Sequence, residues 1–410
     1  MSLGITASTV AHAAPAGASV YVPVSPSRVL DTRVALGFAR RVNAGESFSL
    51  GLPGVPAGAS AVVLNLTIAS SGDGGFVTVY PSGINRPTAS SINVDGAGQT
   101  IANLVTVPIG TGGKVDIFSL MATDLVADVQ GYYVPAGAAT AGRFTPVTPT
   151  RLLDTRDAGA VHRGPLAANE AFTLNVAGLA GLPADATAAA LNVTVTDSKG
   201  SGFWTVFPAG STRPTASNLN VTGVGATIAN QVIARLSGGQ ATVFSQAGGH
   251  LVVDLVGWFT GPSASSSDVG LFVPVTPARL IDTRQIGVSP FKSQTAEVAV
   301  AGRAGLPASG VGAVVVNATI TQSAGAGYFT IWPSRTYRPT ASSLNATYAG
   351  QTIANHVIAP VSTTGFEFYT EAGAHLVADI AGWYTGTETA AVLPAPVPFT
   401  GTSGPPTVQP

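Results

Sequence analysis

Apolar and polar residues alternate along short segments of this chain, and the same alternation occurs three times. In residues 61–68 every second side chain is Val, Leu or Ile, while Asn65 and Thr67 lie between them. The segments 189–195 and 314–320 repeat this arrangement, again with Asn and Thr on the polar face. A period of two over several residues is typical of a β-strand with one buried face. We therefore expect three equivalent half-buried strands.

The other predicted strands are also short. The aromatic segments 75–81, 203–208 and 328–333 each end in Pro, which cannot donate a hydrogen bond to a sheet. No segment shows the period of a helix, so the sequence predicts an all-β protein. Roughly eight or nine antiparallel strands per repeat fit tandem β-sandwich modules of the jelly-roll kind. The alternative is a six-bladed propeller in which each repeat supplies two blades.

A six-residue signature, Arg-x-Leu/Ile-Asp-Thr-Arg, opens each repeat at residues 28–33, 151–156 and 279–284. An Arg-Pro-Thr-Ala-Ser stretch, a Thr-Ile-Ala-Asn turn and a closing Asp-x-x-Gly-aromatic strand follow in the same order each time. This periodicity predicts three modules. Their expected bounds are residues 20–135, 142–260 and 271–385. The linkers 136–141 and 261–268 have flexible compositions, which would let modules touch without fixing an angle.

The two ends of the chain differ from the repeats. Residues 1–19 contain Ala11-His12-Ala13, an Ala-x-Ala pattern typical of signal-peptide cleavage, although no basic segment precedes it. We interpret this segment as a signal-peptide remnant, with a flexible tail as the alternative. Residues 386–410 are rich in Pro, Gly and Thr, which is typical of a disordered or polyproline-like stalk.

Charged residues make up only 10% of the chain, so those that recur in every repeat stand out. The second recurring Asp lies within an apolar strand, where a carboxylate is costly unless it is paired. Arg suits it as a partner, because a planar guanidinium can hold a carboxylate with two hydrogen bonds. We expect an internal ion-pair cluster in every module, with a surface pocket for an acidic or sugar ligand as the alternative. The predicted members are Asp31, Arg33, Arg86 and Asp128, then Asp154, Arg156, Arg213 and Asp254, and finally Asp282, Arg284, Arg338 and Asp379.

Recurring Asn residues and the Trp residues are further candidates. Asn65, Asn93 and Asn103 have counterparts in each repeat, and we expect them to hold loops by hydrogen bonds, with sugar binding as the alternative. Most Trp side chains are expected in the core or between modules. If their rings are instead exposed and coplanar, they would form a platform for carbohydrate. The four Trp residues are Trp204, Trp258, Trp332 and Trp383.

Composition excludes several classes of function. The net charge of −1 and the presence of only three Lys residues argue against nucleic-acid binding and against a polybasic lipid site. The chain has no Cys, which excludes disulfides and thiolate chemistry. No Glu recurs, and the only aligned His residues, His250 and His375, are replaced by Asp124 in the first repeat. No nucleophile elbow, phosphate loop or zinc spacing is present, so we expect neither catalysis nor a metal or other cofactor. No apolar run is long enough to span a membrane as a helix.

Five motifs covering most of residues 20–385 resemble a tandem repeat of secreted and cell-surface proteins of actinobacteria and related bacteria. They are Arg-Leu-Leu-Asp-Thr-Arg, Leu-Asn-Val-Thr, Arg-Pro-x-x-Ser-x-Leu-Asn, Ala-Asn and the closing Val-Asp-x-x-Gly-Trp strand. The resemblance implies a secreted, non-catalytic module. We therefore expect a structural or adhesive protein whose partner is an envelope component, a polysaccharide or another copy of itself. The alternatives are a carbohydrate- or cell-wall-binding accessory module and, less favoured, a hydrolase.

Overall fold

The computed structural model describes residues 14–286 and 292–394, and β-strands dominate these residues. They contain 24 strands in three consecutive sets of eight, each set occupying one repeat of the sequence. Three 3-10 helices of three residues each interrupt them: Thr32–Val34 (η1), Thr111–Gly113 (η2) and Leu179–Gly181 (η3). Residues 1–13 of the predicted signal-peptide remnant and residues 395–410 of the predicted stalk lie outside the described residues.

Every module is a sandwich of two four-stranded antiparallel sheets. We call the sheet that carries the Asp-Thr-Arg strand the inner sheet and the other the outer sheet. In the first module the inner order is β1-β8-β3-β6 and the outer order is β2-β7-β4-β5. The strands are β1 (Ser19–Asp31), β2 (Glu46–Gly51), β3 (Ala61–Ala69), β4 (Gly75–Pro81), β5 (Ile92–Val94), β6 (Ile101–Pro108), β7 (Lys114–Ser119) and β8 (Asp124–Pro135).

The second and third modules repeat both strand orders. The second has β9 (Phe144–Asp154), β10 (Glu170–Asn175), β11 (Ala188–Thr196), β12 (Gly202–Pro208), β13 (Leu219–Val221), β14 (Ile228–Arg235), β15 (Gln240–Ser245) and β16 (His250–Phe259). The third has β17 (Phe272–Asp282), β18 (Gln294–Val298), β19 (Val311–Thr321), β20 (Gly327–Pro333), β21 (Leu344–Ala346), β22 (Ile353–Pro360), β23 (Phe366–Thr370) and β24 (His375–Thr385).

The strand order is that of a jelly roll. Within each module the chain crosses from one sheet to the other at every connection except the one between the fourth and fifth strands, β4 and β5 in the first module. A propeller blade would instead join consecutive strands within one sheet. The predicted jelly-roll sandwich is therefore confirmed, and the propeller alternative is wrong.

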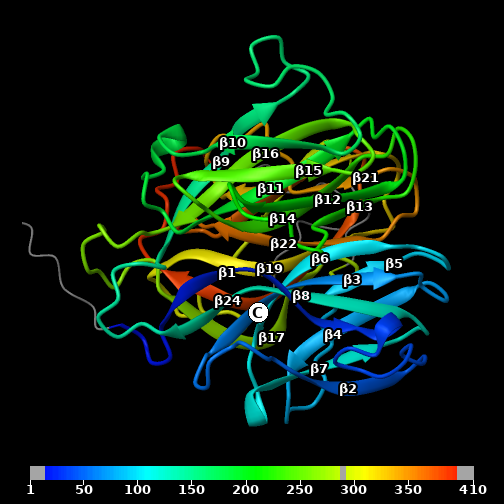
Figure 1. The fold of residues 1–410 in the computed structure, drawn as a ribbon. Coiled ribbons are helices and arrows are strands. Elements are labelled where there is room, and N and C mark those ends of the chain that lie inside the picture. The colour runs from blue at the N-terminus through cyan, green and yellow to red at the C-terminus, as the bar shows by residue number, and fades with distance from the viewer. Residues whose placement is uncertain (1–13, 287–291, 395–410) are drawn as a thin grey trace, which may run out of the picture.

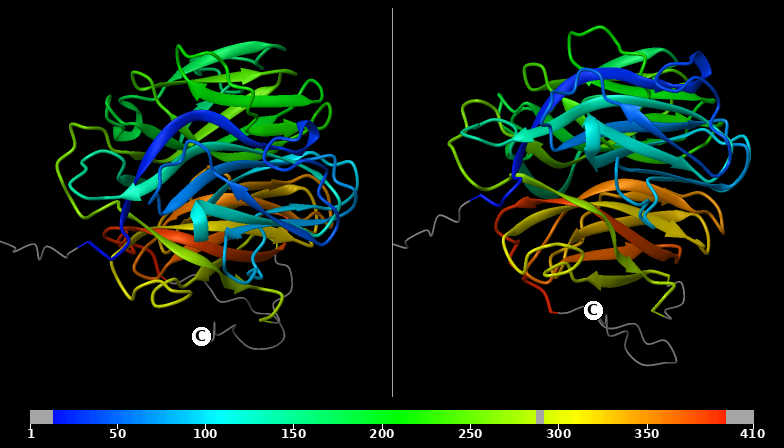
Figure 2. Two further views of the ribbon diagram at one scale, coloured as in Figure 1. Left: turned by 60° about the horizontal axis from the view of Figure 1, so that its bottom comes forward. Right: turned by 90° about the horizontal axis from the view of Figure 1, so that it is seen from below.

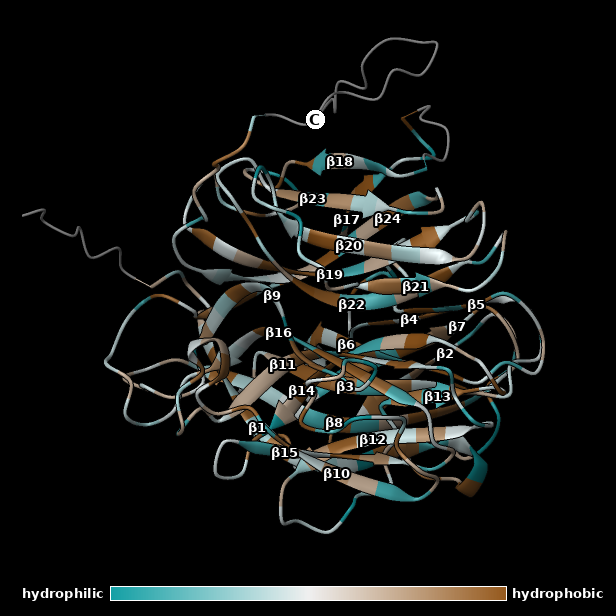
Figure 3. Cartoon of the chain, turned by 90° about the horizontal axis from the view of Figure 1, so that it is seen from above, coloured by the Kyte–Doolittle hydropathy of each residue, from teal (hydrophilic) through white to brown (hydrophobic). Residues whose placement is uncertain are grey.

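The strands predicted to be half-buried are buried on both faces. Strand β3 is buried along its whole length, including Asn65 and Thr67. Its apolar face packs between the two sheets of the module, with Leu64 and Leu66 in that core. Its opposite face meets the other modules. Figure 3 shows hydrophobic and hydrophilic residues alternating along single strands, so burial of the polar face requires partners from outside the module.

The three inner sheets pack against one another around a common axis. The last inner strands, β6, β14 and β22, contact each other in all three combinations. Figures 1 and 2 show the result as one assembly in which each module contacts the other two. A separate buried cluster, distinct from the three sandwich cores, draws residues from all modules, including Val63, Ala190 and Val315. The molecule therefore resembles a trimer made from a single chain.

Aromatic rings fill one end of this axis. Tyr21, Phe144 and Phe272 occupy equivalent places in the three first inner strands, and each lies over the Gly of the closing Asp-x-x-Gly motif. A Cβ on Gly257 would lie 2.4 Å from the ring of Phe144. The recurring Gly therefore makes room for the axial ring. The remaining rings come from the closing strands as Tyr133, Phe259 and Tyr384.

Both linkers lie at this aromatic end, and the expectation that they leave the module angles free is wrong. The side chain of Arg143, only 4% exposed, donates hydrogen bonds to the carbonyl oxygens of Ala139, Ser265 and Ser267. The inner sheets of the first and third modules also join through the pairing of Ser19 with Phe272. Packing of the modules fixes their angle, whatever the composition of the linkers.

Candidate functional site

The Asp-Thr-Arg signature builds a compact ion-pair cluster on the inner sheet. Arg28 contacts two carboxylates: its Nε lies 2.9 Å from Asp128 on β8, and its Nη1 lies 3.1 Å from Asp31 on β1. Arg33 binds Asp31 with both its side chain and its backbone N–H. The corresponding residues are Arg151 with Asp154 and Asp254, Arg279 with Asp282 and Asp379, and the outer arginines Arg156 and Arg284.

The two carboxylates of a cluster differ in their electrostatics. Hydrogen bonds from Arg33 hold the pKa of Asp31 below its usual value, and Arg156 does the same for Asp154. Burial raises the pKa of Asp128, and the hydrogen bonds from Arg28 offset this only in part. Asp128 is 1% exposed, so its charge depends on Arg28 for compensation. These groups serve packing, because neither carboxylate is open to a ligand.

The same Arg also reaches the next module. Arg28 Nη2 donates to the carbonyl oxygen of Thr215 at 3.0 Å, Arg151 to that of Thr340, and Arg279 to that of Thr88. The direction is cyclic: the first module contacts the second, the second the third, and the third the first. Thr215, Thr340 and Thr88 belong to the Arg-Pro-Thr-Ala-Ser stretch. Two sequence motifs that lie far apart thus form one contact between modules.

The recurring Asn residues of the central inner strands follow the same cycle. Asn65 donates to the carbonyl of Ser217, Asn192 to that of Ser342, and Asn317 to that of Ser90. These Asn residues hold loops, as expected, but each loop belongs to a neighbouring module. Asn103 holds the loop of its own module through Ser91, also by its side-chain amide.

Arg86, Arg213 and Arg338 do not belong to the ion-pair cluster, which corrects their predicted place. The guanidinium of Arg86 lies 3.7 Å from the ring centroid of Phe118, that of Arg213 lies 3.8 Å from Phe244, and that of Arg338 lies 3.7 Å from Tyr369. No ion pair joins them to a carboxylate among the described residues. An aromatic face attracts a guanidinium electrostatically, which accounts for these contacts without a carboxylate. Arg28, Arg151 and Arg279, the first Arg of each signature, instead pair with the buried Asp of the closing strand.

The Trp residues do not form an exposed platform. Trp204 is completely buried, Trp332 is 2% exposed and Trp383 is 6% exposed. Trp258 is partly buried against the core of the second module. Their rings therefore contribute to packing, which agrees with the expectation that most Trp side chains lie in the core or between modules.

The axis itself carries polar groups at its centre. Leu104, Gln231 and His356 occupy equivalent positions in β6, β14 and β22 and are all buried. His356 lies 2.6 Å from Gln231 Oε1 and 2.9 Å from the Thr106 hydroxyl. Burial lowers the pKa of His356 to about 3. The ring is therefore neutral, with Nδ1–H donating to Gln231 and Nε2 accepting from Thr106.

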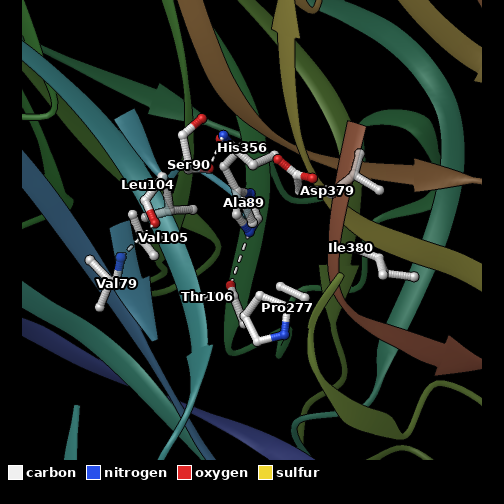
Figure 4. Close-up of a pocket in the computed structure, with 14 residues that line it drawn as sticks. Val79, Ala89, Ser90, Leu104, Val105, Thr106, Pro277, His356, Asp379 and Ile380 are labelled. Atoms are coloured by element: carbon white, nitrogen blue, oxygen red, sulfur yellow. Dashed lines mark hydrogen bonds between the residues drawn. The ribbon is translucent and has the colours of Figure 1, made fainter. Parts of the chain in front are cut away.

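Small cavities between the modules hold no more than water. Figure 4 shows the one between the first and third modules, with Thr106 and His356 joined by a hydrogen bond near Asp379. Its volume is about 30 Å³, and that of the cavity between the second and third modules is about 10 Å³. Such volumes accommodate about one water molecule. They are part of the packing between modules.

A larger depression, which we call the axial depression, opens at the end of the axis opposite the aromatic rings. Its volume is about 300 Å³. All three modules line it around the loop between the fifth and sixth strands. The Thr-Ile-Ala-Asn segment, predicted as a turn, has only its Thr in this loop, because the sixth strands begin at Ile101, Ile228 and Ile353. The lining residues are Ala97 to Ile101 of the first module, Asn220 to Thr222 and Ala226 to Ile228 of the second, and Asn345, Thr347, Tyr348, Gln351 and Ile353 of the third.

The axial depression was not among the predicted sites. Its lining includes Asn220 and Asn345, the counterparts of Asn93, whose expected role is to hold loops, and the first residues of the Thr-Ile-Ala-Asn segments. The available signal was the recurrence of the turn directly before an inner strand, once per module. The sequence of a single repeat does not reveal that the three modules close around an axis and bring these segments together.

The described residues hold no group of three or more His, Cys, Asp or Glu side chains placed to bind a metal ion. Within the same part of the chain, no helix has the length and apolar character needed to cross a membrane.

No family model and no curated protein matches this chain. Among solved structures, similar ones include a protein described under "Life in the extremes: atomic structure of Sulfolobus Turreted Icosahedral Virus", with 9% identity and a TM-score of 0.18 over 90% of this chain and 92% of that one. A second is described under "The Triple Jelly Roll Fold and Turret Assembly in an Archaeal Virus", with 10% identity, the same coverage of both chains and a TM-score of 0.18. At this TM-score the likeness carries no argument about function, and the jelly-roll assignment rests on the strand order.

Proposed function

We propose that this protein is a secreted, non-catalytic adhesive protein of the cell surface. Its three jelly rolls act as one rigid head. The observation that carries the proposal is that the two ends of the three-module assembly, along its axis, differ. Both linkers and the outermost strand ends, Ser19 and Thr385, lie at the aromatic end, whereas the axial depression opens at the other.

Rigidity supports a role in adhesion. The cyclic contacts of Arg28, Arg151 and Arg279 join every module to the next. The loops that line the axial depression therefore keep fixed positions. A preformed site loses less conformational entropy on binding than loops that must first be ordered. A site built by three modules at once exists only in this closed arrangement.

The chemistry of the recurring charged groups supports a non-catalytic role. Their carboxylates are buried and paired with Arg, so they are not available as general acids or bases. The axial His356 is buried and neutral, with both ring nitrogens engaged. The resemblance to a repeat of secreted and cell-surface proteins of actinobacteria agrees with this proposal and is the basis for placing the protein outside the cell.

Binding of the labelled protein to intact bacterial cells and purified cell envelopes tests the proposal. We expect saturable binding with no soluble product released from the envelope. A purified, unrelated protein of similar size and net charge serves as the control. Release of envelope fragments would point to the hydrolase alternative, and absence of saturable binding to every envelope would overturn the adhesive role.

A further inference from the structure

We infer that the axial depression binds a short neutral saccharide. This inference rests on the proposed adhesive function for its biological setting, and it names the class of ligand. Three features of the depression carry it: the absence of charge in the lining, the hydrogen-bond donors of its side chains, and its apolar Ile residues.

The lining has no charged side chain. Asp95, the nearest carboxylate on these loops, is engaged at the rim: Tyr348 donates its hydroxyl to Asp95 at 2.8 Å, and the Thr352 backbone N–H donates at 2.9 Å. An anionic ligand would find no cation here, and a cationic ligand would find no free carboxylate. A neutral polar ligand therefore fits the electrostatics of the depression best.

Side-chain amides supply hydrogen-bond donors. The oxygen of Asn220 accepts from the Ser217 hydroxyl, that of Asn345 accepts from Ser342, and that of Gln351 accepts from the Thr347 backbone N–H. Their oxygens are thus occupied, and among the described residues no protein acceptor takes their NH2 groups. Three donors from two modules consequently line one depression. Hydroxyl, ring and acetamido oxygens of a sugar are acceptors for such groups.

The floor and rim add apolar contacts. Ile101, Ile228 and Ile353, one from each module, line the depression. Tyr348 is 44% exposed at its edge. Sugar rings present apolar C–H faces beside their hydroxyl groups, and this mixture matches an apolar floor with polar walls. The volume of about 300 Å³ lies at the lower end of ligand pockets, which span roughly 300–1,000 Å³.

Two variants change the depression without removing the contacts that hold the modules. Thr222→Trp puts a bulky ring into it from an exposed lining position. Asn345→Asp keeps the oxygen that accepts from Ser342 but replaces the NH2 donor with a charged acceptor. The matched control is Val161→Trp, a substitution to the same residue in the same module at a loop position that is 80% exposed and does not line the depression.

The full chain and the three variants are applied to an array of neutral oligosaccharides of glucose, N-acetylglucosamine, mannose and galactose, with uronic-acid glycans and peptides beside them. We expect binding to neutral glycans, a loss of at least about tenfold in affinity for Thr222→Trp and Asn345→Asp, and unchanged binding for Val161→Trp. Circular dichroism and thermal melting of each variant show that a loss of binding is not a loss of fold.

The outcomes separate this inference from the proposed function. Saturable envelope binding without any neutral-glycan binding, or glycan binding that ignores both depression variants, overturns the inference and leaves the adhesive function standing. Binding to uronic-acid glycans or peptides alone overturns the inference as well. Neutral-glycan binding that depends on the depression, without any binding to envelopes, supports the inference and overturns the adhesive function.

Discussion

At the scale of single residues, the Asp-Thr-Arg signature joins two strands of the inner sheet to each other and one module to the next. Arg28 binds one carboxylate on its own strand, one on the closing strand and one carbonyl of the next module. A guanidinium has five N–H donors in a fixed plane, which a Lys ammonium does not offer. The geometry of the cluster therefore explains why Arg, and not Lys, stands at this position in all three repeats.

Replacing Arg28 with Met is expected to destabilise the protein by about 3–5 kcal/mol, because Asp128 would keep a buried charge without its partner. Urea titration gives the free energy of unfolding. Arg40→Met is the control: Arg40 pairs with Glu46 at the surface, and its side chain is 52% exposed. Loss of such a solvent-exposed pair is expected to change the free energy of unfolding little. Equal effects of the two variants would contradict the role given to Arg28.

Acid is expected to destabilise the protein through His356. The pKa of His356 in the folded protein is about 3, well below the ordinary value near 6.5 that applies to the unfolded chain. A depressed folded pKa contributes stability that is fully present above about pH 6.5 and is lost as the pH falls toward about 3. The loss approaches about 1.4 kcal/mol per pH unit within that window.

His356→Gln isolates this effect, since Gln already occupies the equivalent position 231. The variant should lose less stability than the parent protein between about pH 7 and pH 4, as measured by thermal melting at both values. The acidic groups titrate in both proteins, so the difference between them reports His356. Identical pH dependences in the two proteins would show that His356 is not held neutral by burial.

At the scale of elements, each closing strand must leave space for an aromatic ring. Gly257 on β16 lies beneath Phe144, and a Cβ there would also come within 2.5 Å of the Thr145 carbonyl oxygen. The Gly of the Asp-x-x-Gly motif is thus required by a close approach between neighbouring strands, although its backbone adopts no left-handed conformation.

Gly257→Ala should lower the free energy of unfolding by about 1–3 kcal/mol, the usual cost of overpacking a filled core. Gly159→Ala is the matched control, because a Cβ at Gly159 meets no atom within 4 Å. We expect the control to be neutral or slightly stabilising, since Ala restricts the unfolded chain. Chemical denaturation of both variants would refute the close-packing argument if Gly257→Ala proved as stable as the control.

The sequence predicts the elements better than their partners. Alternation around Leu64 and Leu66 identifies β3, and the repeated signature correctly places Arg33 next to Asp31. Charge alone suggested Arg86 as a partner of Asp128, because a pattern in one dimension does not reveal that the ring of Phe118 lies beneath its guanidinium. The axial depression was beyond prediction for a similar reason, since it exists only after three separate modules close.

At the scale of the whole molecule, the three modules behave as the subunits of a cyclic trimer. In the second module, Asn192 donates to the Ser342 carbonyl of the third module. The carbonyl of Ser217, also in the second module, accepts the equivalent hydrogen bond from Asn65 of the first. Each module therefore carries both halves of the contact. Such head-to-tail contacts close into a ring when the rotation between neighbours fits.

An isolated second module, residues 142–260, is expected to associate with itself, because Phe144 and Phe259 would otherwise be exposed. Light scattering after size-exclusion chromatography should show a trimer or larger species. The variant Asn192→Ala in the isolated module should weaken that association. A stable monomer of the isolated module would contradict the view that the axial core needs all three inner sheets.

Covalent fusion gives this head a freedom that three identical subunits lack. On a true threefold axis every side chain appears three times, so a single His could not pair with a single Gln. Here Leu104, Gln231 and His356 differ, and the Asp95–Tyr348 contact occurs on one side of the rim only. A ligand at the centre of a homotrimer has three orientations of equal energy. In this chain those orientations are inequivalent, so substitutions in a single module can favour one orientation of a ligand about the axis.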